Sequence, residues 1–424
     1  MKIDSKKIDP VRDYENREKA LRERISNGVE EVLTRGVEQV VDKEHFKKAL
    51  ASGKKLRIKL GIDPTGEKIH IGRATQLWKL KVFQDLGHKI VLIIGDFTAR
   101  IGDPSDKPEG RKGLKEEEIK KNVKSYSAQI GKILDLEKTE IRYNSEWFNK
   151  MPLGDFLHLT GNFSVQQLVQ RRNFHERWKK GEPISLKEIC YPLLQGYDSV
   201  AVKADMELGG YDQLFNLNAG RDIQRLFGMP PQDIMTLKML SGLDGRKMST
   251  SWGNVVNIVD EPEDMYGKLM SMRDEMILDY FELCTLVSDK ELSEIKKELK
   301  NKKVNPKDIK ARLAREIVSL YHSEKSAQKA EQEFNKIFKE KSLPSRMPVF
   351  FTPKPSYPIV ELLFHLGLAS SKGEGKRLVL QGGVKVDSKV IKDFKQEIKV
   401  KDEMIIQVGK RKFAKLITHD GRCE

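Results

Sequence analysis

A chain of 424 residues exceeds one ordinary hydrophobic core, so we expect separate catalytic and recognition domains. The formal net charge is +15, and residues 341–424 hold 17 Lys and Arg against 9 Asp and Glu. That asymmetry favours a polyanionic partner, although a solvated lysine-rich surface gives the same balance. Three scattered cysteines suit neither a disulfide framework nor a zinc site, so we expect no protein-held metal. Without an apolar leader or a run of ~20 apolar residues, we expect a cytoplasmic protein and no membrane partner.

The first 100 residues predict a lead-in segment and a βαβ unit. Residues 1–55 are charged, and Val29, Val32, Leu33, Val37 and Val40 have helical spacing, so one or two amphipathic helices or a docking arm are expected. Residues 56–62 and 89–97 then predict buried parallel strands on either side of a helix over 70–86. The unit has no GxGxxG, which argues against a nicotinamide or flavin oxidoreductase.

The rest of the chain predicts an α/β protein of several domains. A parallel-sheet catalytic domain over 56–240 carries a largely helical insertion at about 110–190, and a mobile loop followed by helices occupies 241–341. Five prolines within 342–358 predict an extended linker, because proline does not fit a regular helix. A small α+β domain over 359–424 completes the chain.

Two segments carry chemistry typical of a nucleotide site. GIDPTGEKIHIGR (61–73) places His70, Gly72 and Arg73 at a helix start, where free N–H groups favour phosphate and a bare glycine admits a flat purine. SGLDGRKMSTSWGN (241–254) is a flexible loop with Arg246, Lys247 and small hydroxyl residues, which suits closure over a triphosphate. A helix with a polar first residue and a solvated surface loop are the alternatives.

Together, HIGR and KMSTS resemble the HIGH and KMSKS signatures of class I aminoacyl-tRNA synthetases. The segment YPLLQGYDSVAVKADMELGGYDQLFNLNAGRDI (191–223) is similar to the pocket segment of bacterial tyrosyl-tRNA synthetases. The resemblance runs from about residue 30 to the end. It implies a Rossmann-like catalytic domain, a helical tRNA-binding domain over 241–341, and a homodimer formed through the 110–190 insertion. It also implies L-tyrosine, ATP with Mg²⁺, and tRNA(Tyr) as substrates and partners.

The resemblance assigns site residues in three groups. Catalysis falls to His70, Arg73, Lys247, Thr250 and Ser251. Nucleotide binding falls to Gly72, Gly210, Asp212, Lys247 and Met248. Substrate binding falls to Lys59, Asp63, Thr98, Asp103, Tyr191, Gln195, Asp198 and Gln213, with Asp198 accepting the phenolic hydrogen. Independently, Tyr191, Gln195 and Asp198 at i, i+4 and i+7 would share one helix face and offer acceptors to an ammonium and a phenol, although an ordinary polar helix face has the same spacing.

The C-terminal segment 362–391 is similar to a small RNA-binding fold first seen in a ribosomal small-subunit protein. Its Lys372, Lys376, Arg377 and Lys385 would track a phosphate backbone. Gly373 and Gly375 are poor helix formers, so a short helix is expected there.

Three departures keep other functions open. Lys59 occupies the place of a tyrosine that touches the phenol in many relatives, Arg73 replaces the second histidine of HIGH, and Thr250 replaces the second lysine of KMSKS. The alternatives are a tryptophanyl-type enzyme and a catalytically silent paralogue that binds RNA.

Overall fold

The computed structural model describes residues 29–103, 113–301, 304–338, 347–409 and 412–418. Contacts divide the chain into two compact units, Met1–Ser326 and Ala327–Glu424. The domain limits drawn from the sequence stay predictions. None of the described helices is both long and apolar enough to cross a membrane.

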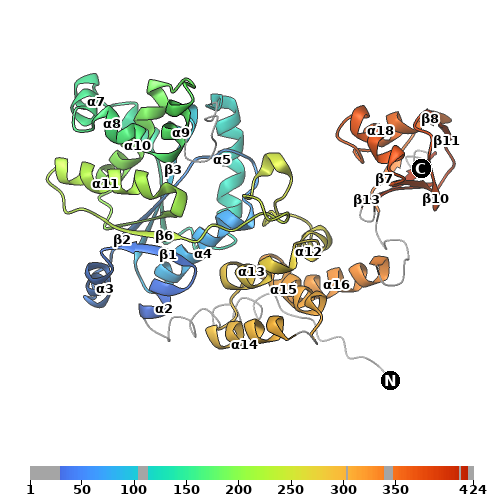
Figure 1. Ribbon diagram of the computed structural model, residues 1–424, viewed down its shortest axis with the longest axis horizontal. Coiled ribbons are helices and arrows are strands. Elements are labelled where there is room, and N and C mark those ends of the chain that lie inside the picture. The colour runs from blue at the N-terminus through green and yellow to red at the C-terminus, as the bar shows by residue number, and fades with distance from the viewer. Residues whose placement is uncertain (1–28, 104–112, 302–303, 339–346, 410–411, 419–424) are drawn as a thin grey trace. The chain divides into compact units, whose positions relative to one another are not determined.

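The first unit is built on one six-stranded sheet with the order β1-β6-β5-β2-β3-β4 (Figure 1). The five strands from β6 to β4 are parallel, and β1 lies antiparallel to β6 at one edge. Apolar runs in the inner strands match burial on both faces, as expected of a parallel sheet. The strands are β1 Val37–Val41, β2 Arg57–Ile62, β3 Lys89–Ile94, β4 Thr139–Tyr143, β5 Met206–Gly210 and β6 Asp233–Leu237.

Two strands correct the sequence-based expectations. Val37 and Val40 lie on β1 rather than on an amphipathic helix, because β-branched valines favour strands and pairing with β6 outweighs their helical spacing. Within the expected helical insertion, β4 pairs with β3 and belongs to the sheet. The helices of this region therefore lie on both sides of β4, with α5 (Glu116–Ile130) before it and the others after it. Residues 1–28 lie outside the described structure.

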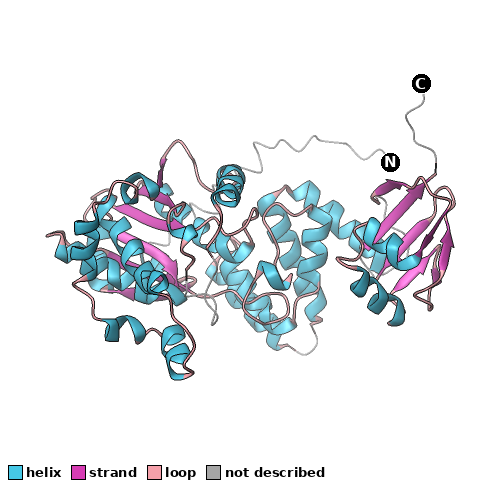
Figure 2. Ribbon diagram, turned by 90° about the horizontal axis from the view of Figure 1, so that it is seen from above, coloured by secondary structure: helices cyan, strands magenta, loops and turns pink. Residues whose placement is uncertain are grey.

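Helices cover both faces of the sheet (Figure 2). Helix α4 (Ile71–Asp85) follows β2 and lies against one face, while α10 (Leu186–Ala201) and α11 (Leu214–Leu226) lie against the other. The last two helices approach closely, since a Cβ on Gly196 would lie 2.6 Å from Ile223 Cδ1 and 3.0 Å from Gly220 N. Two glycines thus set how tightly α10 and α11 pack over the sheet.

Further helices connect these elements and form the insertion. They are α2 Val29–Thr34, α3 Lys43–Ala51, η1 Thr98–Arg100, α5 Glu116–Ile130, α6 Ser145–Phe148, α7 Leu153–Thr160, α8 Val165–Val169, α9 Arg172–Lys179 and η2 Tyr211–Gln213. Apolar residues of α7, α8, α10 and α11 form one small core containing Leu159, Leu168, Leu193 and Ile223. The insertion is therefore anchored on the helices that cover the sheet.

A helical region follows β6, as the sequence predicts. It contains η3 Thr250–Trp252, α12 Pro262–Met270, η4 Asp274–Met276, α13 Ile277–Cys284, α14 Asp289–Lys300, α15 Pro306–Tyr321 and α16 Glu324–Phe338. Tyr280, Phe281 and Ile317 are fully buried between these helices. Pro306 opens α15 at a position where its missing N–H costs nothing, and Asn305 caps that helix.

The second unit contains most of α16, a five-stranded sheet with the order β10-β9-β12-β13-β7, a two-stranded sheet β11-β8, and helices α17 and α18. Its elements are β7 Val349–Phe351, β8 Ser356–Pro358, α17 Ile359–His365, α18 Lys372–Leu380, β9 Val384–Val386, β10 Lys389–Val390, β11 Glu397–Lys399, β12 Ile405–Val408 and β13 Lys412–Ile417. Residues 347–358 are therefore part of this fold and not a linker. Prolines forbid helix there, but not edge strands such as β7.

Candidate active site

A cleft of about 880 Å³ lies in the first unit at the carboxyl ends of the parallel strands. Ligands of open α/β sheets bind at this edge, because the loops that follow neighbouring strands meet there. Both chemistry-bearing segments line the cleft: His70, Gly72 and Arg73 follow β2, and Lys247, Met248 and Thr250 come from the loop after β6.

The first segment forms the start of α4. His70 is the N-cap, and its Nδ1 accepts a hydrogen bond of 3.2 Å from the backbone N–H of Arg73. The remaining N–H groups of the first turn favour an anion. A Cβ on Gly72 would lie 3.0 Å from Met248 Sδ, so the two segments meet directly across this glycine.

Arg73 directs its guanidinium toward the turn that precedes α4. Its Nη1 donates to Tyr126 Oη at 2.9 Å and to the Asp63 carbonyl at 3.3 Å, and Nη2 donates to Thr65 Oγ1 at 2.9 Å. These contacts use uncharged oxygens. These acceptors fix the orientation of the planar guanidinium fork.

Asn254 organises the second segment. Its side-chain amide donates to Asp244 Oδ1 at 2.8 Å and to the Lys247 carbonyl at 3.1 Å, and its oxygen accepts from Ser249 N at 2.8 Å. Hydrogen bonds from Asn254 and then Arg246 hold the pKa of Asp244 well below its usual range. One buried side chain thus fixes three points of the loop.

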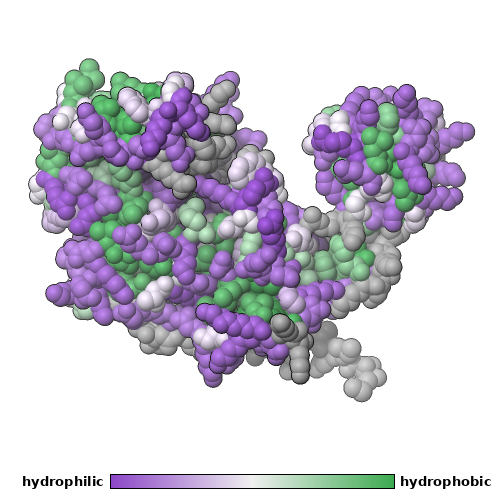
Figure 3. Space-filling model, viewed as in Figure 1, coloured by the Kyte–Doolittle hydropathy of each residue, from purple (hydrophilic) through white to green (hydrophobic). Residues whose placement is uncertain are grey.

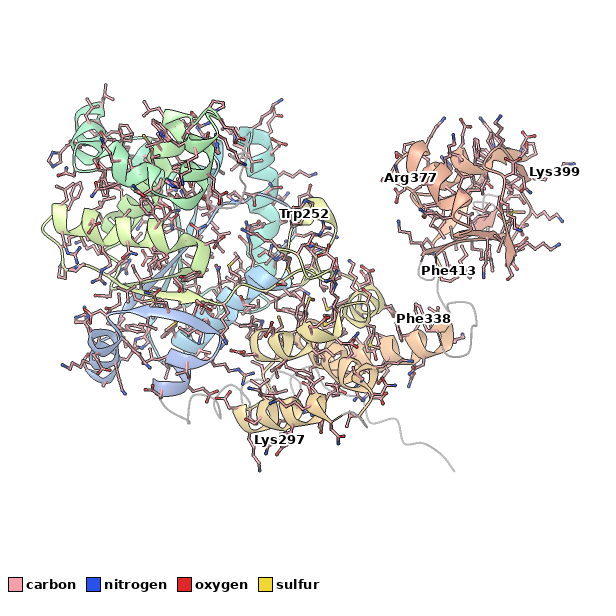
Figure 4. All side chains as sticks on the ribbon, in the orientation of Figure 1. Trp252, Lys297, Phe338, Arg377, Lys399 and Phe413 are labelled. Atoms are coloured by element: carbon pink, nitrogen blue, oxygen red, sulfur yellow. The ribbon has the colours of Figure 1, made fainter. Side chains whose placement is uncertain are left out.

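The rest of the loop places two cationic side chains near the cleft, and each is paired with a carboxylate, Lys247 with Asp212 and Arg246 with Asp244. Lys247 Nζ lies 3.2 Å from Asp212 Oδ2, and Arg246 stacks 4.8 Å from the ring of the half-exposed Trp252. Figure 4 labels Trp252 on this loop. The side chain of Ser251 lies outside the described structure.

An acidic end lies deeper in the cleft. Asp63 is held by Thr98 Oγ1 and Tyr191 Oη, which donate to its two oxygens at 2.8 Å each. Burial raises the pKa of Asp63 to about 6. A Cβ on Gly95 would lie 2.0 Å from Asp63 Oδ1 and 2.4 Å from Thr98 Oγ1, so this arrangement requires glycine.

Amide side chains extend the acidic end. Asp103 accepts from Gln213 Nε2 at 2.7 Å and from Arg171 Nη2 at 3.4 Å. Asn216 Nδ2 donates to the side-chain oxygens of Gln213 at 2.9 Å and Gln195 at 2.8 Å, which fixes the orientation of both amides. Carboxylates and oriented amides close together suit a bound ammonium group.

Asp198 forms the other end of the pocket, on the face of α10 that also carries Tyr191 and Gln195. Its Oδ1 accepts from Trp147 Nε1 at 3.0 Å, and the residue is buried. Burial raises the pKa of Asp198 to about 7, against the opposing influence of Lys59 and Trp147. When ionised, this carboxylate is an acceptor suited to one further hydroxyl donor.

Comparison with known proteins identifies the family. The family of class I tRNA synthetases (W and Y) matches residues 50–339, and the S4 domain family matches residues 358–404. The tyrosine–tRNA ligase of Thermotoga maritima is 46% identical over 91% of this chain and 96% of its own length. That of Moorella thermoacetica is 45% identical over 91% and 95%. The chain belongs to the tyrosine–tRNA ligase family.

Solved structures agree in fold with this assignment. A tyrosyl-tRNA synthetase from Archaeoglobus fulgidus, complexed with L-tyrosine, matches 74% of this chain with a TM-score of 0.59 and 22% identity. A tryptophanyl-tRNA synthetase from Plasmodium falciparum matches 75% with a TM-score of 0.55 and 16% identity. The fold is therefore shared between tyrosyl and tryptophanyl enzymes, and the sequence relatives separate them.

The cleft brings together nearly all the residues that the family resemblance assigns, although their individual roles stay predictions. Those in its lining are Asp63, His70, Gly72, Arg73, Thr98, Asp103, Tyr191, Gln195, Asp198, Gly210, Asp212, Gln213, Lys247, Met248 and Thr250. Lys59 is different, because it is fully buried beneath the cleft and does not contribute to its lining.

Sequence reasoning missed three supporting residues: Trp147, Glu207 and Asn254. The sequence does indicate a role for Glu207, because a single acidic residue within an apolar strand needs a buried partner. Nothing in the sequence around Trp147 indicates that its indole reaches Asp198, since the two residues meet only through the fold.

We expect Asn254→Ala to loosen the signature loop without unfolding the protein. The variant loses three hydrogen bonds, each contributing about 0.5–1.5 kcal/mol, so amide hydrogen exchange in residues 241–254 should accelerate about tenfold or more. Mass spectrometry of exchanged peptides measures this rate. Asn218→Ala, which removes one hydrogen bond within α11, is the matched control. Equal exchange in both variants would show that Asn254 does not organise the loop.

Proposed function

We propose that this chain activates tyrosine with ATP and transfers it to the 3′-terminal ribose of tRNA(Tyr). The observation that carries the proposal is that polar groups stand at two separate ends of the cleft, next to the two segments typical of a nucleotide site. Asp63, Asp103 and the oriented amides face one end, and Asp198 stands at the other. A zwitterionic amino acid with a hydroxyl on its side chain fits both ends, whereas phenylalanine adds no donor to those that the protein already gives the buried Asp198.

The reaction requires positioning more than a side-chain nucleophile. The tyrosine carboxylate attacks the α-phosphorus of ATP, and the bond to pyrophosphate breaks. A ribose hydroxyl of tRNA then attacks the acyl carbon, and AMP leaves. The N-terminus of α4, Arg73 and Lys247 would stabilise the charge on the phosphates, which is the principal contribution of a protein to phosphoryl transfer.

Magnesium would enter with the nucleotide. Among the described residues, no group of three or more His, Cys, Asp or Glu side chains is placed to hold a metal ion. Mg²⁺ at ATP sites is usually held by phosphate oxygens together with water and one or two carboxylates. When bound, it would neutralise charge on the departing pyrophosphate. Because tRNA and ATP are cytoplasmic in bacteria, we also place the protein in the cytoplasm.

Amino-acid-dependent pyrophosphate exchange tests the proposal directly. Tyrosine should support efficient exchange, while tryptophan and phenylalanine should have a kcat/KM lower by several orders of magnitude. Exchange with tryptophan would indicate the tryptophanyl alternative. The absence of exchange with all three amino acids would indicate a silent paralogue.

Asp198→Ala should raise the KM for tyrosine about 10- to 100-fold and leave the KM for ATP unchanged, because a hydrogen bond to a charged group contributes about 1.5–3 kcal/mol. Steady-state exchange kinetics measure both constants. The control is Asp222→Ala on α11, since that carboxylate is exposed and pairs with Arg225. An unaltered tyrosine KM in Asp198→Ala would contradict the assignment of the phenol site.

The second unit would bind tRNA through α18. Lys376 lies 4.4 Å from the ring of Phe394, Lys372 pairs with Glu361 at 2.6 Å, and Lys385 follows on β9. Helix α18 spans only nine residues, in keeping with its two glycines. A short basic helix in an S4 domain supports contact with a phosphate backbone.

Removing the basic side chains of α18 should weaken tRNA binding without affecting exchange, which does not involve tRNA. Lys376→Ala with Arg377→Ala should lower the slope of log affinity against log salt by about 2, one for each lost phosphate contact. Lys399 lies at the opposite side of the unit (Figure 4), and Lys399→Ala is the comparison. An equal loss in Lys399→Ala would place the RNA surface elsewhere.

The insertion would form a homodimer. Leu153 and Leu157 on α7 are 71% and 58% exposed, and Val165 on α8 is 53% exposed. Figure 3 shows hydrophobic residues on the surface where α7 lies in Figure 1. The two leucines share one helix face at i and i+4, while Leu159 packs inward. An apolar face of this kind is typical of a protein interface.

We expect Leu153→Glu with Leu157→Glu to convert a dimer into a monomer, because paired carboxylates at a symmetric apolar contact repel. Sedimentation velocity of the full chain measures the mass. Leu380→Glu, at a 60% exposed position of the second unit, should leave the dimer intact. A dimer that survives the double substitution would place the interface on another surface.

A further inference from the structure

A lysine and a glutamate lie fully buried beneath the phenol end of the pocket. Lys59 on β2 and Glu207 on β5 are opposite each other in the register of the two parallel strands. Their side chains are 0% and 1% exposed, and Lys59 Nζ lies 2.9 Å from Glu207 Oε1. Buried charges of this kind persist only when each has its partner.

Hydrogen bonds complete the pair. Lys59 Nζ also donates to Ser199 Oγ at 2.7 Å and to the Gln195 carbonyl at 3.0 Å. Glu207 accepts from Gln232 Nε2 at 2.5 Å, Ser199 Oγ at 3.2 Å and Gln195 Nε2 at 3.3 Å. The ammonium therefore has three oxygen partners, and both glutamate oxygens are satisfied.

The pair lies directly beside Asp198. Gln195 and Ser199, which contact Lys59, stand three residues before and one residue after Asp198 on α10. The titratable groups that act on Asp198 are Lys59 from β2, Glu207 from β5 and Tyr191 on α10 itself, and α6 contributes the neutral donor Trp147. From β3, the residues on this face are the apolar Val91 and Ile93.

The balance of buried charges makes the ionisation of Asp198 depend on Lys59. Asp198 and Glu207 are two neighbouring buried carboxylates, and like charges in a dry site oppose the ionisation of both. Lys59 is the cation packed against them. Without it, one proton would be retained, and the carboxyl that faces the ligand would lose its charge.

We propose that Lys59, held in place by Glu207, offsets the charge of that glutamate and keeps Asp198 ionised, so that Asp198 accepts the phenolic hydrogen of tyrosine and rejects phenylalanine. The inference rests on the proposed function and extends it to residues that do not touch the substrate. Lys59 is a positioning residue, acting through the charge of Asp198. Its influence should therefore depend on pH and on the substrate hydroxyl.

The sign of the pH effect follows from the carboxyl chemistry. Below its pKa, Asp198 is protonated and the charge-assisted bond is lost, so kcat/KM for tyrosine should fall toward low pH. Losing a nearby opposite charge raises a carboxyl pKa by about 1–3 units, and losing a nearby like charge lowers it. Phenylalanine makes no bond to Asp198, so its kcat/KM should lack this acid limb.

Pyrophosphate exchange from pH 6 to 9.5, with tyrosine and separately with phenylalanine, tests the inference in the full-length protein. Lys59→Met should move the acid limb for tyrosine about 1–3 pH units higher. At pH 7 this lowers the tyrosine-to-phenylalanine ratio of kcat/KM about tenfold or more, and the ratio recovers at high pH. Glu207→Gln should move the acid limb to lower pH. The double variant Lys59→Met with Glu207→Gln should have a tyrosine-to-phenylalanine ratio of kcat/KM at pH 7 close to that of the wild type.

Ser199→Ala is the matched control, because it removes hydrogen bonds of the same network without changing charge. Its acid limb should stay at the wild-type pH. If Lys59→Met does not fold, the expected shift of the acid limb to lower pH in Glu207→Gln still tests the inference. A pH-independent loss in Lys59→Met that affects both amino acids equally, or a Glu207→Gln limb that does not move to lower pH, would overturn the inference. Wild-type protein without tyrosine-dependent exchange at any pH would instead refute the proposed function, and the inference with it.

Discussion

The ion pair between Lys59 and Glu207 is the interaction on which the end of the cleft around Asp198 depends. Neither charge can be buried alone, so β2 and β5 must stay in register and α10 must present Ser199 and Gln195 to the pair. Room for Glu207 and Gln232 comes from Gly220, where a Cβ would lie 2.7 Å from Gln232 Nε2. The same close approach of α10 and α11 orients the amides above. The packing of α10 on α11, the burial of the two charges and the shape of the cleft therefore depend on one another.

Much of the fold follows from local pattern. Apolar β-branched runs at β2 and β3 are unambiguous, and His70 caps α4 where the sequence places a helix start. The errors at β1 and β4 have a different origin. Both are five-residue edge strands with mixed polarity, and their pairing partners come from distant parts of the chain. Such strands are stabilised by tertiary pairing, which no local periodicity reports.

The site residues also fall into those that local sequence indicates and those that only the fold brings together. Motif residues such as His70, Lys247 and Asp198 could be assigned because their order and spacing survive in the primary sequence. The resemblance assigns Lys59 to substrate binding, but its side chain does not line the cleft, since resemblance supplies a position along the chain and not the environment of a changed side chain. A lysine in place of a tyrosine cannot play the same part; it needs a counter-charge, and Glu207 supplies it. The rule that buried charges are paired would have linked the two apolar strands that each carry one charge.

The two ends of the amino-acid pocket differ in how far they tolerate redesign. At the ammonium end, Asp63 and Thr98 meet over Gly95, and no larger residue fits there while their hydrogen bond is kept. At the phenol end, the supporting groups are side chains, contributed by Trp147, Lys59 and Glu207. Engineering toward other amino acids should therefore leave Gly95, Asp63 and Thr98 unchanged, because the backbone at Gly95 restricts that end. It should exchange the charges around Asp198 as a balanced set, because a single altered charge would leave another one buried and uncompensated.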